Sequence, residues 1–78
     1  MSATLDEIKL LDVVALLQDV PEEGLRRGEV GTVVEVFEQT EHHPAGFLVE
    51  FSDREGRAYS TADLSAEQLI RLRHRDAA

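Results

Sequence analysis

Cysteine and tryptophan are absent from this chain of 78 residues, and proline occurs only twice. Without cysteine the chain can form neither a disulfide nor a thiolate metal site, so its hydrophobic core must hold the fold by itself. One tyrosine and three phenylalanines are too few for the aromatic grooves that bind proline-rich peptides. The sequence also lacks an apolar run of the roughly 18 residues that a membrane span needs and a basic, apolar targeting signal at its start. We therefore expect a cytoplasmic protein that does not associate with membranes.

The chain has few basic side chains. The chain has eight Lys and Arg against sixteen Asp and Glu, which gives a formal net charge of −8. Nucleic-acid affinity depends on clustered Lys and Arg that contact phosphates, so this balance argues against DNA or RNA as the main partner. The final stretch RLRHRDAA, which begins at Arg71, is locally basic. We interpret residues 73–78 as a flexible, soluble tail rather than as a phosphate-binding arm.

The chain contains no internal repeat, low-complexity tract, linker or shift of composition, so it is predicted to form one domain. Near its start, Thr4 and Glu7 form a capping-box pattern that predicts one or two helical turns before Leu10. In the next segment, LDVVALLQDV, apolar and β-branched residues favour a strand. A helix there is the competing interpretation, and Pro21 and Gly24 weaken it because both residues interrupt helices.

Four further segments also have the composition of strands. The stretch FLVEFSD alternates in the manner of a half-buried strand, and Gly56 in the DREG that follows fits a tight hairpin. Ser65 and Gln68 form a second capping-box pattern, which predicts a single helical turn before the last strand. The predicted strands cover residues 11–20, 30–38, 47–52, 57–63 and 69–73.

Five short strands, a long first loop, one hairpin and a helical turn before the last strand form the element order of an SH3-like barrel. We therefore predict an all-β (mainly β) fold, a small five-stranded SH3-like barrel that comprises the single domain 1–78 with its core in about residues 8–72. Gly28 and Gly31 flank the entry to the second strand and are interpreted as the bend that lets the barrel close. A phosphate cradle needs a helix after its glycine loop, whereas a strand is predicted here.

Aromatic side chains are expected in or beside this core. Phe37, Phe47 and Phe51 are predicted to be buried or half-buried, since each buried phenylalanine stabilises the fold by about 2–3 kcal/mol. Tyr59 lies on the predicted fourth strand, where packing against the core is favoured over a role as a surface anchor.

Three segments, LLDVVALLQDVPEEGLRRGEVGTVVEV, FLVEFSDREGRAY and LSAEQLIRL, resemble domain-of-unknown-function family 4926, a group of small bacterial proteins, over about residues 8–72. The resemblance implies the same small barrel and supplies no catalytic residue or cofactor. Some members are encoded beside toxin-like proteins, which would suit an antitoxin or immunity role. A broader likeness to translation-factor and ribosomal barrels rests on a GxxGTV turn at residues 28–33, but the loops that are basic in those relatives are acidic here.

Catalytic and metal chemistry have little support in the sequence. There is no cysteine nucleophile and no GxSxG motif. Glu35 and Glu50, on neighbouring predicted strands, fit an exposed solubilising face better than a catalytic carboxylate pair. His42 and His43 fit a solvated loop better than a metal site, which would need a third ligand such as Glu41. We predict that the chain is not an enzyme and holds no metal or cofactor.

The stretch EEGLRRGE in the long first loop is the most plausible contact surface. An apolar residue flanked by charges is common at protein contacts, yet it equally suits a loop folded back on the barrel, and both interpretations of Leu25 stay open. The candidate partner-binding residues are Glu22, Glu23, Leu25, Arg26 and Arg27.

The favoured hypothesis is a non-enzymatic protein-binding module whose acidic surface and long loop engage a protein with a basic surface. An antitoxin or immunity partner is its most concrete form, and that form depends on the family resemblance. A nucleic-acid or ribosome-associated barrel is the alternative, favoured only if Arg26 and Arg27 form one basic patch with the segment from Arg71 to Arg75. A small-ligand or metal sensor is a further alternative, and the sequence predicts no oligomeric state.

Overall fold

The computed structural model describes residues 7–73. Its five strands are β1 (Val13–Leu16), β2 (Val30–Phe37), β3 (Gly46–Ser52), β4 (Ala58–Leu64) and β5 (Leu69–Arg71). Two short 3₁₀ helices, η2 (Pro21–Glu23) and η3 (Ala66–Gln68), lie in the first loop and directly before β5. The described residues contain no α-helix, so the prediction of an all-β fold with one helical turn before the last strand is confirmed.

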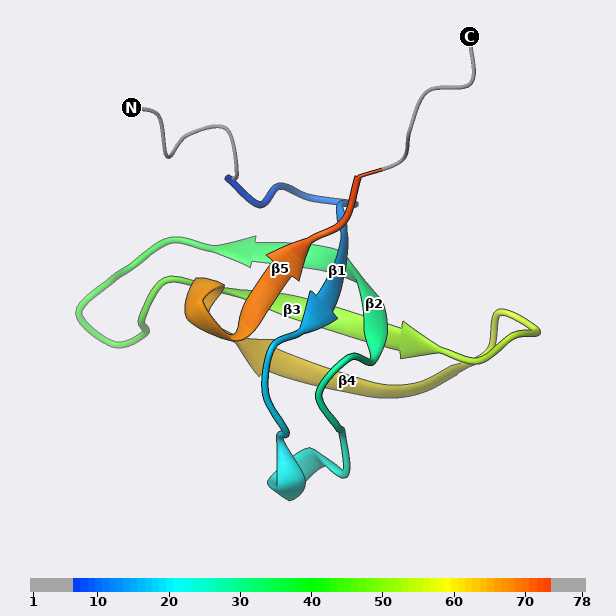
Figure 1. Ribbon diagram of the computed structural model, residues 1–78. Helices are drawn as coiled ribbons and strands as arrows, with labels where there is room; N and C mark the ends of the chain where they lie inside the picture. The colour runs from blue at the N-terminus through cyan, green and yellow to red at the C-terminus, as the bar shows by residue number, and fades with distance from the viewer. Residues whose placement is uncertain (1–6, 74–78) are drawn as a thin grey trace, which may run out of the picture.

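All five strands form one antiparallel sheet in the order β4-β3-β2-β1-β5. The long strand β2 joins the two halves of the sheet, because its first three residues pair with β1 and all of its residues except Val30 and Val34 pair with β3. In Figure 1 the short strands β1 and β5 cross the long strands β3 and β4, so the sheet bends back on itself. The result is the small barrel-like fold that the sequence predicts.

The segment before β1 differs from the prediction. The prediction of a helical turn before Leu10 is wrong for residues 7–9, which have no regular structure. A β-turn spans Lys9–Asp12 instead. The carboxylate of Asp12 accepts the backbone N–H of Lys9 at 2.8 Å, and such a local bond competes with helix formation. Thr4, the predicted cap, lies outside the described residues.

The first strand is also shorter than predicted. β1 ends at Leu16, whose carbonyl oxygen accepts the N–H of Gly28 at 2.8 Å and so closes the base of the first loop. Inside that loop Val20 and Leu25 form an isolated antiparallel bridge. The apolar run that predicts a strand to residue 20 therefore continues into a loop that is itself folded against the protein.

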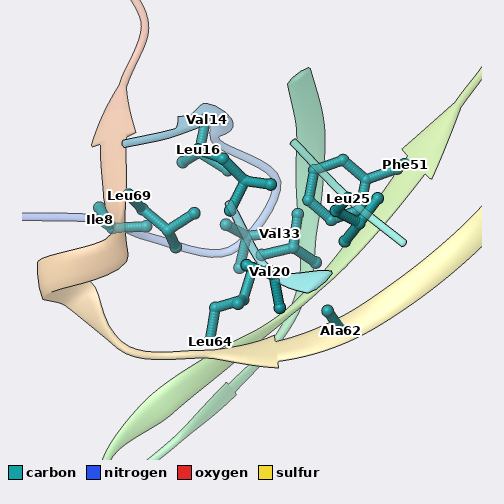
Figure 2. Close-up of a cluster of buried hydrophobic side chains, with 11 residues drawn as sticks. Ile8, Val14, Leu16, Val20, Leu25, Val33, Phe51, Ala62, Leu64 and Leu69 are labelled. Atoms are coloured by element: carbon teal, nitrogen blue, oxygen red, sulfur yellow. The ribbon is translucent and has the colours of Figure 1, made fainter. Parts of the chain in front are cut away.

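The hydrophobic core lies inside the bend of the sheet, and Figure 2 shows its side chains converging from the strands and the first loop. Phe51 is fully buried and Phe47 packs at the margin of the core, while Phe37 is half-buried, in agreement with the prediction for all three. The core residues are Ile8, Val14, Leu16, Val20, Leu25, Val33, Val49, Phe51, Ala62, Leu64 and Leu69.

Gly28 and Gly31 support the bend interpretation for two different reasons. Gly28 has a φ of 92°, in the left-handed region that side chains other than glycine rarely adopt. Gly31 has an ordinary φ, but a Cβ there would lie 2.7 Å from Cγ1 of Val49 and 2.8 Å from the carbonyl oxygen of Glu50. β3 therefore approaches the backbone of β2 at Gly31 as only glycine allows, and β2, not a helix, follows these glycines.

Two β-bulges interrupt the pairing of the long strands. The register shifts between Val33 and Glu35, which leaves Val34 as an extra residue on β2. A second shift, between Phe51 and Ser52, leaves Tyr59 as an extra residue on β4. Bulges bend and twist a strand and redirect the side chain at the extra position, so both sites alter which residues reach the surface.

Candidate protein-contact surfaces

The first loop, residues 17–29, carries the five residues predicted to bind a partner. Leu25 is only 2% exposed and belongs to the core. Its backbone N–H donates to the carbonyl oxygen of Val20 at 3.1 Å and its own carbonyl oxygen accepts from Val20 at 2.9 Å. The interpretation in which the loop folds back on the barrel is therefore correct for Leu25, and this side chain is not accessible to a partner.

The four charged residues of the predicted site are exposed. Glu22 and Glu23 lie in η2, and the loop then turns at Gly24 with a φ of 71°. The backbone N–H of Arg26 donates to Oε2 of Glu29 at 2.7 Å, and that of Arg27 donates to Oδ1 of Asp19 at 2.9 Å. Carboxylates thus hold the loop backbone and leave both arginine side chains exposed.

Tyr59 is 52% exposed, so the prediction that its side chain is packed is wrong. The bulge on β4 makes it an extra residue, and its hydroxyl donates a hydrogen bond to Oε1 of Glu29, just before β2. That hydrogen bond, followed by the one from the backbone N–H of Arg26, lowers the pKa of the Glu29 carboxyl. The same carboxylate raises the pKa of the Tyr59 phenol, because it stabilises the protonated hydroxyl.

A larger apolar surface lies on the convex side of β2, β1 and β5. The strand register places Val30 and Ile70 on either side of Ala15, and Thr32 and Leu72 on either side of Val13. We define the outer face as Val13, Ala15, Leu17, Val30, Thr32, Ile70 and Leu72.

The outer face contains no charged residue, and Thr32 is its one polar member. Four of its apolar side chains are between 39% and 48% exposed: Leu17, Val30, Ile70 and Leu72. Single exposed apolar residues are normal on a protein surface, whereas contiguous ones mark an interaction surface.

Acidic side chains border the outer face on the side of β3 and β4. Glu50 pairs with Thr32, and Leu48 lies between Glu35 on β2 and Asp63 on β4. The bulge at Val34 places Glu35 opposite Leu48, so Glu35 and Glu50 do not face each other as a pair. This acidic border, Glu35, Glu50 and Asp63, gives the adjoining apolar surface a negatively charged edge.

The two histidines have different surroundings. His42 is highly exposed, with Nε2 3.7 Å from Oε1 of Glu41. His43 packs its ring on Phe37, with centroids 4.8 Å apart, and places Nε2 3.2 Å from Oδ2 of Asp63. Within residues 7–73, no three histidine or carboxylate side chains gather closely enough to hold a metal ion.

Arg26, Arg27 and Arg71 do not gather on one side of the protein. Arg71 pairs with Asp12 through Nε at 3.5 Å, near the end of β5. Figure 1 shows this end of β5 and the first loop, with Arg26 and Arg27, at opposite ends of the molecule. The basic patch that the nucleic-acid alternative requires is thus not formed by these three residues, and Arg75 lies outside the described part of the chain.

Sequence reasoning did not find the outer face, although a signal for it is present. Strands with one solvated face alternate apolar and polar residues, and strands covered on both faces read as continuous apolar runs. The run VVALL from Val13 to Leu17 is of the second kind. Val14 and Leu16 face the core, whereas Val13, Ala15 and Leu17 lie on the outer face, where Ala15 is covered, Val13 is half-buried and Leu17 is exposed.

Fold and surface together define a small, acidic, all-β domain of barrel-like form with an apolar outer face. The family model described as Domain of unknown function (DUF4926) matches residues 10–71, and the chain belongs to this family. Comparison with curated proteins found no match, and comparison with solved structures found none. Along residues 7–73, no helix is long and apolar enough to cross a membrane.

Proposed function

We propose that this chain is a non-enzymatic protein-binding module whose outer face contacts a protein with a basic surface. The observation that carries the proposal is a group of four exposed apolar side chains without a charged residue among them: Val30 on β2, Ile70 on β5, and Leu17 and Leu72 directly after β1 and β5. Burial of apolar surface stabilises a complex by roughly 25 cal/mol per Å² before the costs of association. Burial of the outer face in a complex therefore contributes favourable binding free energy.

The charge of the chain supports a basic partner. The formal net charge is −8, and the acidic border adjoins the outer face directly. A negative surface accelerates association with a basic protein and disfavours acidic ones, and salt weakens both effects. Glu22 and Glu23 in the first loop add to this field, and we propose that they assist binding.

Photo-crosslinking in the native cell tests the proposal. A photoreactive amino acid at Ile70, on the outer face, is expected to capture one defined protein, which mass spectrometry identifies. The matched control carries the same group at Arg54, an exposed residue of the turn between β3 and β4 that belongs to neither the outer face nor the acidic border. Val30→Lys is expected to abolish capture from Ile70 because it buries a charge in the contact.

Equal labelling from Ile70 and Arg54, or capture from Ile70 that Val30→Lys leaves unchanged, contradicts the proposal. An antitoxin or immunity role is a specific form of the same function. In that form the captured protein is toxic when expressed alone, and co-expression with this chain restores growth. If co-expression fails to restore growth, the antitoxin or immunity role is rejected. The crosslinking result still supports the protein-binding module in that case.

A further inference from the structure

A groove runs along one rim of the barrel, where the N-terminal segment, β3, η3 and β5 meet. It consists of two adjoining hollows of about 480 Å³ and about 380 Å³. The residues common to both hollows are Glu7, Ile8, Phe47 and Ala66. We call this feature the rim groove, and its inner surface is mainly apolar.

The rim groove is continuous with the outer face. Leu17 and Ile70 belong to the outer face and also line the larger hollow, beside the buried side chain of Leu69. The apolar surface therefore passes from the convex side of β1 and β5 into a concave site. Concave apolar sites of this size accept large side chains, and such anchors contribute most of the free energy at many interfaces.

Carboxylates dominate the charge at the rim groove. Glu7 lines both hollows and Glu38 lines the smaller one, and both residues are exposed. Arg71 lines the larger hollow, where its guanidinium pairs with Asp12 and donates to the carbonyl oxygen of Glu7 at 3.5 Å. The arginine charge is thus balanced by a neighbour, and the groove favours a ligand with a positive charge beside its apolar part.

We propose that the rim groove is an anchor site for one large apolar or aromatic side chain of the partner protein, flanked in the partner's sequence by Lys or Arg. The inference rests on the proposed function and adds the chemistry of the segment that is bound. The anchor side chain lies over Phe47 and Ala66, and the flanking cation lies near Glu7 or Glu38. A second copy of this acidic chain is disfavoured as the occupant, because its own carboxylates repel those of the groove.

Short peptides test the anchor site without knowledge of the partner. Acetyl-Lys-Trp-Lys-amide at millimolar concentration is expected to shift the amide NMR signals of Ile8, Phe47 and Ala66. Acetyl-Lys-Ala-Lys-amide lacks the aromatic anchor side chain, and acetyl-Glu-Trp-Glu-amide carries negative charges in place of the flanking positive ones. Both are expected to bind at least about tenfold more weakly, since each lacks one of the two complementary features.

A filling variant provides the matched control within the protein. Ala66→Phe places a ring in the groove from an exposed position, so folding is preserved and the affinity for the first peptide is expected to fall at least about tenfold. Ala58→Phe makes the same change at an exposed position that lines neither hollow, and it is expected to leave binding unchanged.

Three results overturn the anchor site: no shifts with the first peptide, equal binding of all three peptides, or binding that Ala66→Phe does not weaken. Shifts at the groove that grow with protein concentration in the absence of peptide identify a second copy as the occupant and also overturn it. The proposed function fails separately, through the crosslinking experiment at Ile70. A partner captured there whose binding Ala66→Phe leaves intact supports the module and rejects the anchor.

Discussion

The hydroxyl of Tyr59 donates a hydrogen bond to the carboxylate of Glu29 across thirty residues of sequence. The contact joins the end of the first loop, directly before β2, to the bulge on β4, and β3 lies between these two strands in the sheet. Glu29 also accepts the backbone N–H of Arg26, so one carboxylate holds both the loop and β4. The first loop is thereby tied to β4.

The Tyr59–Glu29 contact predicts a specific dependence on pH. The lowered pKa of Glu29 means that the contact stabilises the fold at neutral pH and that this contribution is lost as pH falls through the folded-state pKa. The raised pKa of Tyr59 means that the contribution is also lost as pH rises through that value. Tyr59→Phe is expected to raise the pKa of Glu29 toward its ordinary value, measured by NMR titration of the carboxyl carbon.

The stability of Tyr59→Phe should differ from that of the wild type by less than about 1 kcal/mol, because the hydrogen bond is exposed. The difference is expected at neutral pH and should vanish in acid, where Glu29 is protonated in both proteins. An unchanged titration of Glu29 in the variant shows that the two side chains are not hydrogen-bonded in solution.

Leu25 is predicted to be a core residue in its effect on stability. Leu25→Ala removes a buried side chain and should destabilise the protein by about 3 kcal/mol in a denaturant titration. Leu10→Ala, at an exposed leucine before β1, is the matched control and should change the free energy of unfolding by less than about 0.5 kcal/mol. Equal stabilities of the two variants place Leu25 at the surface and contradict the folded-back loop.

Gly31 and Gly28 should respond differently to alanine. Gly31→Ala places a Cβ within 2.8 Å of a backbone oxygen that cannot rotate away, so it should cost about 3 kcal/mol. Gly28→Ala has open space around the new atom and strains only the backbone, at a cost of about 1 kcal/mol. Thermal unfolding of both variants measures the difference, and a reversed order argues against the close approach of β3 to β2.

Phe51 should be the most sensitive of the three phenylalanines. Phe51→Ala empties the centre of the core and should cost about 3–5 kcal/mol, enough to unfold a domain of this size. Phe37→Ala removes a half-buried ring that packs on His43 and should cost about 1 kcal/mol. Similar melting temperatures for the two variants contradict the strand register of β3.

The strands could be predicted from the sequence where local side-chain preferences favour the same pairing that the structure shows. Alternation along β3 and the left-handed glycine at position 56 define a hairpin that depends on few distant residues. The capping box of Ser65 and Gln68 forms as predicted, with both reciprocal hydrogen bonds present. Such features depend on neighbours within a few residues, so the sequence shows them directly.

The bulges and the loop were not predictable in the same way. Nothing local to Tyr59 marks it as an extra residue, since the bulge arises from how β4 pairs with β3. Leu25 has the same charged neighbours whether it is exposed or buried, and its burial depends on the bridge to Val20 and on the space inside the bent sheet. The bulge at Tyr59 and the burial of Leu25 therefore both depend on contacts between segments that are distant in the sequence.

The amino-acid sequence by itself determined the number and order of the strands, the absence of disulfides and the acidic character of the chain, because composition, periodicity and glycine placement act locally. The tertiary structure alone decided that Val14 and Leu16 of β1 face the core while Ala15 lies on the outer face between the exposed side chains of Val30 and Ile70. Which face of a strand is covered depends on how the sheet bends and what packs on each side, and that is a property of the assembled chain.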